Sequence, residues 1–197
     1  MKFRLFGTEV YISFLFMAVI TIMLATDRTG LILPSLFAII MHEAGHLFAM
    51  WLLECAPKQV RLIPASVQIT SSFSRKYRND VAVAVCGPLV NLVLFLVLYF
   101  NYLAFKNELV LNYALLNLII FIFNSLPVYG LDGGTVLYSI LAKKTSLNKA
   151  ELTVKIITAA VAVALLILAV ILTVNHKLNL SPYIIAIYLL ISCLIKM

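Results

Sequence analysis

The sequence has few charged residues, which make up 12% of the 197 positions, whereas 63% are hydrophobic. A soluble globular domain is about 45–50% apolar, and the mean hydropathy of +1.07 also lies outside that class. The apolar residues form long runs that are separated by short charged stretches. This pattern predicts an all-α membrane protein whose helices cross the bilayer several times.

Cysteine is also scarce, because the chain holds only Cys55, Cys86 and Cys193. Their odd number and wide spacing exclude a disulfide framework and a CxxC metal or redox motif. We interpret them as small apolar residues packed in or near the membrane. No internal repeat or low-complexity segment is present.

The net charge of +7 could indicate a nucleic-acid partner, but the basic residues lie between the apolar runs, so they form no basic face. We expect no nucleic-acid binding. With the N-terminus in the cytoplasm, twelve basic residues face the cytoplasm and three face outside, as the positive-inside rule requires. The three are Arg28, Lys106 and Lys177. With six spans, both termini are then cytoplasmic.

The six predicted spans belong to one integral membrane domain over residues 1–197, with a core at about 8–142 and two last helices at about 155–196. The first is a retained helix, because Ala25-Thr26-Asp27 is no convincing signal-peptide cleavage site. The spans are Val10–Thr26, Leu31–Leu53, Val81–Phe105, Leu109–Leu126, Ile156–Val174 and Leu178–Ile195.

Two segments depart from simple spanning helices. Pro57–Ser74 has strand composition with a break at Pro64-Ala65, which predicts a membrane-associated β-hairpin after the second span, with a plain cytoplasmic loop as the alternative. Lys2–Ile12 also alternates and could add a strand. After the fourth span, Pro127 and three glycines predict an irregular turn that faces the interior and is followed by a short helix.

The second span contains His42-Glu43-Ala44-Gly45-His46. Positions i and i+4 share a helix face, so both histidines can bind one metal ion, and Glu43 is placed to act on its bound water. A catalytic zinc commonly has three protein ligands. The third histidine, His176, falls near the opposite membrane face, so we predict that His42, His46 and Asp132 bind one Zn²⁺ per chain. Gly133 and Gly134 would let the backbone turn the carboxylate inward.

Two asparagines lie beside these residues in the spans. Asn124 is a candidate hydrogen-bond donor to the reaction intermediate, with an ordinary interhelical hydrogen bond as the alternative. Gly87 and Asn91 share one face of the third span, and we favour a packing role beside the site over direct substrate contact.

The motifs His42-Glu43-Ala44-Gly45-His46, Gly87-Pro88-Leu89-Val90-Asn91 and Asn124-Ser125-Leu126-Pro127 with Leu131-Asp132-Gly133-Gly134 together resemble those of site-2 proteases. These are intramembrane zinc metalloproteases, and the layout is similar to their sporulation-type branch. The resemblance implies zinc ligands at His42, His46 and Asp132, a catalytic acid/base at Glu43 and a substrate-binding amide at Asn124. After the sixth span the sequence holds neither the nucleotide-sensing domain nor the PDZ domain found in other members, so we expect no regulation through such a domain; a chain truncated after the sixth span is the alternative.

We therefore predict a multi-pass cell-membrane protease that cleaves a membrane-tethered regulator, such as a transcription-factor precursor or anti-sigma factor, near the cytoplasmic face. A regulatory membrane partner or a second copy of the chain could also bind. The alternatives are a zinc transporter or sensor without catalysis, and a scaffold protein. A transporter has little need of Glu43 between the two histidines, and the repeated halves of many transporters are absent.

Overall fold

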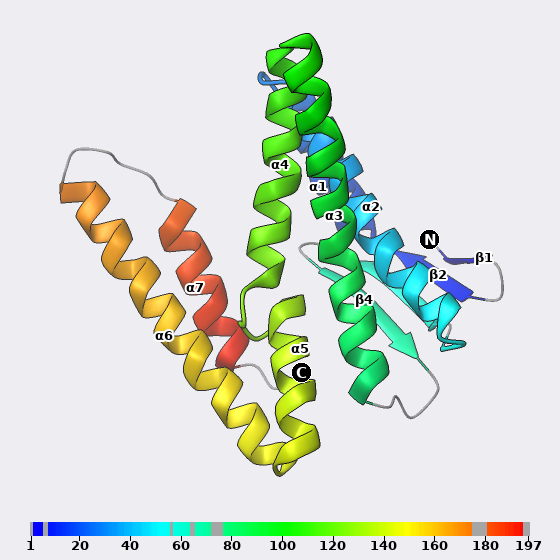
Figure 1. Ribbon diagram of the computed structural model, residues 1–197, viewed down its shortest axis with the longest axis vertical. Helices are drawn as coiled ribbons and strands as arrows, with labels where there is room; N and C mark the ends of the chain where they lie inside the picture. Colours follow the sequence, from blue (N-terminus) through cyan, green and yellow to red (C-terminus); the bar gives the residue numbers. More distant parts are fainter. Residues whose placement is uncertain are drawn as a thin grey trace. The chain divides into compact units, whose positions relative to one another are not determined.

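The computed structural model describes residues 2–5, 8–55, 57–63, 66–71, 77–174 and 181–194 (Figure 1). The chain divides into two compact units, one over Met1–Ile122 and the other over Phe123–Met197. Four of the described helices are long and apolar enough to cross a membrane, and less than a third of each apolar window is buried inside the protein. Apolar side chains left exposed over such a length require a lipid surrounding, so this is a membrane protein.

The first unit begins with two strands, β1 (Lys2–Leu5) and β2 (Thr8–Ile12), and then α1 (Phe14–Thr26). The predicted first span started at Val10 and is wrong there, because Val10–Ile12 lie in β2. Ser13 ends the strand and caps α1, since its Oγ accepts the N–H of Phe16 at 3.3 Å. Hydropathy alone could not separate an apolar strand from the helix that follows it.

The sheet is larger than the predicted hairpin. The strands β3 (Pro57–Ile63) and β4 (Ser66–Ser71) pair antiparallel where the hairpin was expected. In addition, β2 pairs with β3 in parallel and with β1 antiparallel, so the order is β1-β2-β3-β4. The residues at 64–65 and 72–76 lie outside the described part of the chain.

Two long helices form the centre of the first unit. These are α2 (Ile32–Leu52) and α3 (Tyr77–Phe105), which pack side by side, and α4 (Glu108–Ser125) follows them (Figure 1). With 21 residues, α2 is about 31 Å long, enough to cross a hydrocarbon core of about 30 Å. A small buried cluster of Ala49, Met50, Cys55 and Val83 joins α2 to α3.

The second unit contains α5 (Asp132–Lys144), α6 (Leu147–Val174) and α7 (Ser181–Leu194). The irregular turn and short helix predicted after the fourth span are confirmed, because α4 ends at Ser125 and α5 begins at Asp132. The turn is covered by protein: Val128 and Leu131 are buried against Ala162 of α6 and Leu189 of α7.

The helix α6 starts at Leu147, nine residues before the predicted start at Ile156. The added turns carry charge, including an i,i+4 ion pair of 2.6 Å between Glu151 and Lys155. Their low hydropathy therefore predicted a loop, although they are helical. The sixth predicted span began at Leu178, which lies outside the described residues, and α7 is described from Ser181.

The loop that leads into α2 yields a test of stability against pH. The Asp27 carboxylate accepts the N–H groups of Thr29, Gly30 and Ile32 and the hydroxyl of Thr29. These bonds, first that from Ile32 and then that from the Thr29 hydroxyl, hold the pKa of Asp27 below its ordinary value of 3.8.

A depressed carboxyl pKa adds stability that is present above the unfolded value and is lost as the pH falls through the folded value. Wild type should therefore melt above Asp27→Asn at pH 7, and the difference should shrink as the pH falls below 3.8. Thermal unfolding in detergent from pH 7 to about 2.5 measures it. A difference that stays constant over this range would contradict the role of the carboxylate.

Candidate metal centre

The close contact of α2 and α3 depends on two glycines. A Cβ on Gly45 of α2 would lie 2.8 Å from the Cys86 carbonyl oxygen and from Val90 Cγ2. A Cβ on Gly87 of α3 would overlap the imidazole ring of His46. Each glycine thus leaves room for the facing helix, which brings the backbone of α3 within reach of the histidines.

The ring of His42 is held by a side chain of α3. His42 Nδ1 lies 2.7 Å from Asn91 Oδ1, and both side chains are buried. Asn91 donates from Nδ2 to the Ala38 carbonyl and to Asn117 Oδ1, at 3.1 Å each. Both of these partners are oxygens that only accept, so Nδ2 is the donor end of the amide and Oδ1 is the acceptor. His42 therefore carries its proton on Nδ1.

The ring of His46 is held by the backbone of α3. His46 Nδ1 lies 2.8 Å from the Val83 carbonyl oxygen, which can only accept. His46 thus carries its proton on Nδ1 as well. Pro88 follows one turn later inside α3 and has no N–H for the carbonyl of Ala84, so the hydrogen-bond ladder is interrupted in the turn that receives His46.

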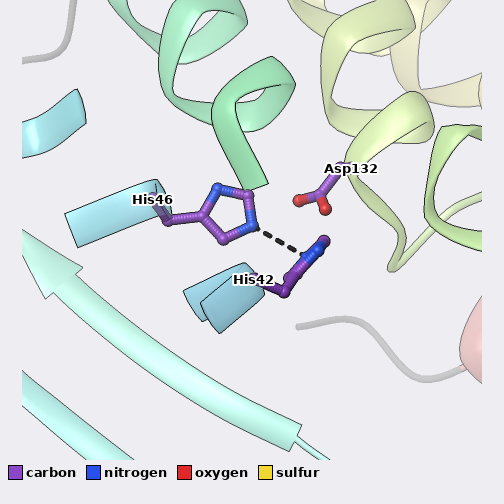
Figure 2. Close-up of side chains that lie close together, drawn as sticks. All are labelled: His42, His46 and Asp132. Carbon is purple, nitrogen blue, oxygen red and sulfur yellow. Dashed lines mark hydrogen bonds between the residues drawn. The ribbon is translucent and has the colours of Figure 1, made fainter. Parts of the chain in front are cut away.

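These two tautomers leave the Nε2 atoms of both rings without a proton. The two Nε2 atoms face each other at 3.1 Å, with the rings nearly perpendicular at 84° (Figure 2). Two lone pairs at this separation repel each other unless a positive charge lies between them. Two nitrogens bound to one tetrahedral zinc at about 2.05 Å are about 3.3 Å apart, so the observed separation fits a shared metal ion.

Glu43 follows His42 on α2 and is half-buried. It lies within α2, the helix that was predicted as the second span. A carboxylate at this depth of an apolar helix is costly, which marks it as a functional group.

The second unit presents Asp132 at the first residue of α5. Its side chain is half-buried, and its Oδ2 is fully enclosed. A Cβ on Gly133 would overlap the carbonyl oxygens of Ser125 and Leu126, and one on Gly134 would overlap the carbonyl of Val128. The two glycines are therefore needed for close backbone approach, and not for the conformational freedom we expected. The turn has its positive φ at Gly130, at 86°.

The turn itself is fixed to α6. The N–H of Tyr129 donates to Thr158 Oγ1 at 2.8 Å, and the Thr158 hydroxyl donates to the Val154 carbonyl. Lys155 lies over the Tyr129 ring at 5.7 Å from its centroid. These contacts hold the segment from which Asp132 projects.

Asn124 lies in the last turn of α4 and is half-buried.

The first unit supplies the two imidazoles of His42 and His46, and the second unit supplies the carboxylate of Asp132. Two imidazoles and one carboxylate, with a position open to water, are a donor set typical of catalytic zinc. His176 lies outside the described residues.

The packing role predicted for Gly87 and Asn91 agrees with their contacts, since Gly87 lies against the His46 ring, Asn91 contacts His42, and Asn91 is 0% exposed. The sequence reasoning missed Asn117, the Val83 carbonyl and Thr158. Asn117 and Thr158 are polar residues buried in apolar helices, which is a usable signal. A backbone carbonyl such as that of Val83 leaves no signal in the sequence.

The chain was compared with known proteins by sequence and by fold. No protein-family model matches the chain. A zinc metalloprotease of Methanocaldococcus jannaschii is 26% identical over 155 residues, which cover 72% of this chain and 45% of that protein. Stage IV sporulation protein FB of Bacillus subtilis is 26% identical over 132 residues, covering 65% of this chain and 46% of that protein. The chain thus spans about half the length of the curated relatives it matches.

A solved structure extends the comparison to the whole chain. The site-2 protease from Methanocaldococcus jannaschii matches with a TM-score of 0.71 and 20% identity, over 100% of this chain and 97% of that one. The chain therefore shares the fold of this site-2 protease.

The overlap between a Cβ at position 87 and the His46 ring gives a test of the metal centre. Gly87→Ala should displace the imidazole and lower zinc affinity, because the ring must leave the Val83 carbonyl. Zinc content after purification and competition with a chromogenic chelator measure the effect. Leu89→Ala, at an exposed position of the same helix, serves as the control and should bind zinc like wild type. Equal affinity in Gly87→Ala and wild type would refute this account of the ring.

Proposed function

We propose that this protein is an intramembrane zinc endopeptidase that cleaves a membrane-tethered regulatory protein near the cytoplasmic face. The observation that carries the proposal is the pair of histidines whose Nε2 atoms converge within a membrane-length helix, with Glu43 next to them. Its similarity to a protein named as a zinc metalloprotease and its likeness in fold to a site-2 protease support the same function.

In this proposal His42, His46 and Asp132 bind one Zn²⁺ per chain. When bound, zinc lowers the pKa of a coordinated water to about 7 and polarises the scissile carbonyl. The chain supplies the orientation: Asn91 and the Val83 carbonyl hold the two imidazoles with their Nε2 lone pairs toward one point. The carboxylate of Asp132 adds negative charge, which suits a dication.

Glu43 is the acid/base group in this mechanism. It takes the proton from the attacking water and passes it to the nitrogen of the leaving amide. Asn124 donates from its side-chain amide to the oxygen on which negative charge develops. A substrate helix has to unwind first, because its peptide bonds are shielded and hydrogen-bonded.

The proposed topology has six spans with both termini in the cytoplasm. In it, α1 and α7, for which 13 and 14 residues are described, are two of the six spans. The loops with Arg28 and Lys106 then face outside. Glu43 lies about 14 Å from the end of α2 at Leu52, near the middle of the helix and slightly toward the end that faces the cytoplasm in this topology.

The role of Asp132 as third ligand can be tested by removing its charge. Asp132→Asn keeps the shape of the side chain but offers zinc a neutral oxygen. We expect zinc affinity to fall by more than the about 10–100-fold typical of outer-shell substitutions. Glu108→Gln, an acid-to-amide change at the exposed first residue of α4, is the control and should leave affinity unchanged. Unaltered zinc binding by Asp132→Asn would exclude it as a ligand.

The proposed chemistry predicts that Glu43→Gln retains zinc but loses cleavage by about 10²–10⁴-fold, because the amide cannot accept the proton from water. The assay uses purified protein in liposomes with a membrane-tethered test substrate, and mass spectrometry of the product locates the cut. Glu54→Gln, an exposed acid just after α2, should cleave like wild type.

Several outcomes of this experiment would contradict the proposal. If wild type and Glu43→Gln both hold zinc and cleave equally, Glu43 is not the acid/base group. If both hold zinc and neither cleaves any of a panel of tethered substrates, a transporter or sensor is favoured. A cut on the outer side of the test substrate would contradict the proposed topology.

A further inference from the structure

We propose that Asn117 is a positioning residue for the metal centre, because it fixes the amide of Asn91 in the orientation that keeps the Nε2 atom of His42 unprotonated. The inference rests on the proposed metal site and goes beyond it, since it assigns a role to a residue of α4 that does not itself face the metal ligands.

Asn117 is 5% exposed and is held by its own helix. Its Nδ2 donates to the Tyr113 carbonyl at 2.9 Å, one turn earlier in α4. This bond fixes which end of the amide is the donor, because a carbonyl oxygen can only accept. Asn117 Oδ1 is thereby turned toward α3, where it accepts from Asn91 Nδ2.

Asn91 is the central member of the network and is fully buried. Its two N–H bonds go to the Ala38 carbonyl of α2 and to Asn117 Oδ1 of α4. Rotation of the amide by 180° would place its oxygen against both of these oxygens. With Asn117 present, the flipped state therefore loses two hydrogen bonds and gains two repulsive contacts. Without Asn117, only the Ala38 carbonyl opposes the flip.

The orientation of Asn91 decides the tautomer of His42. In the observed state Asn91 Oδ1 faces His42 Nδ1 at 2.7 Å and requires a proton there. In the flipped state the NH₂ group would face Nδ1, which would then be the acceptor, and the ring proton would move to Nε2. A protonated Nε2 has no lone pair for a metal ion.

His46 provides an internal reference, because its Nδ1 donates to the backbone carbonyl of Val83. No side-chain substitution at Asn117 alters that acceptor. The proposal therefore predicts a change at one histidine of the pair and none at the other, whereas general loosening of the helix packing would alter both.

The experiment compares wild type, Asn117→Leu and the control Asn112→Leu in detergent micelles. Asn112 is an exposed asparagine of the same helix, and leucine is close to asparagine in shape. Zinc affinity is measured by competition with a chelator. The tautomers are read in the zinc-free proteins at pH 8 from the ¹⁵N shifts of labelled histidine, of which the chain has only three.

We expect Asn117→Leu to bind zinc about 10–100-fold more weakly, to shift His42 toward the Nε2-protonated form and to leave His46 unchanged. The Asn112→Leu control should match wild type in both measurements. Wild-type affinity in Asn117→Leu, or equal changes at both histidines, would overturn the proposal and leave Asn117 with a packing role.

If Asn117→Leu fails to fold, the wild-type spectrum still decides, because the proposal requires His42 to be protonated on Nδ1, and an Nε2-protonated His42 would refute it. The tautomer is measured without zinc, so this test is separate from that of the proposed function. Failure of wild type to bind zinc would refute the metal site, whereas the ¹⁵N shifts report on the network itself.

Discussion

The structure depends on one constraint, which is that both histidine rings of α2 are held with the proton on Nδ1. An imidazole ring has only two nitrogens, so an acceptor at Nδ1 leaves Nε2 as a lone pair. Here the two acceptors come from α3, one as the Asn91 side chain and one as the Val83 carbonyl. The result is two lone pairs facing each other at 3.1 Å, an arrangement that a cation stabilises and that neutral rings alone do not favour.

This constraint explains why polar side chains are retained in apolar helices. An unpaired amide in a bilayer is costly, but Asn91 makes three hydrogen bonds and Asn117 has a partner for each end of its amide. The same contacts require α2 and α3 to be close, which the missing Cβ atoms of Gly45 and Gly87 allow. Helix packing and ligand orientation are thus set by the same few residues.

Much of this arrangement could be predicted from the sequence. Helix geometry predicts from local patterns which side chains share a helix face. It does so for His42 and His46 and for Gly87 and Asn91, and the break before Asp132 is also visible in the sequence. The start of α1 was misplaced because Val10–Ile12 are as apolar as the helix, although they are a strand. The parallel pairing of β2 with β3 joins residues about fifty positions apart and has no local signal. Asn117 was passed over because its role depends on a partner in another helix.

Asp132 is positioned in a different way from the histidines, mainly by packing of the backbone and not by hydrogen bonds between side chains. The turn before α5 is buried through Val128 and Leu131. It is joined to α6 by the hydrogen bond from Tyr129 to Thr158. Gly133 and Gly134 lack Cβ atoms, which lets the start of α5 approach the backbone at the end of α4 and in the turn. The histidines in the first unit and the aspartate in the second are therefore each ordered by contacts within their own unit. Ligands that are ordered in advance lose little conformational entropy when a metal binds, so more of the binding energy appears as affinity. Polar groups without partners are costly in a membrane, so a membrane site is expected to order its polar side chains by packing and hydrogen bonds.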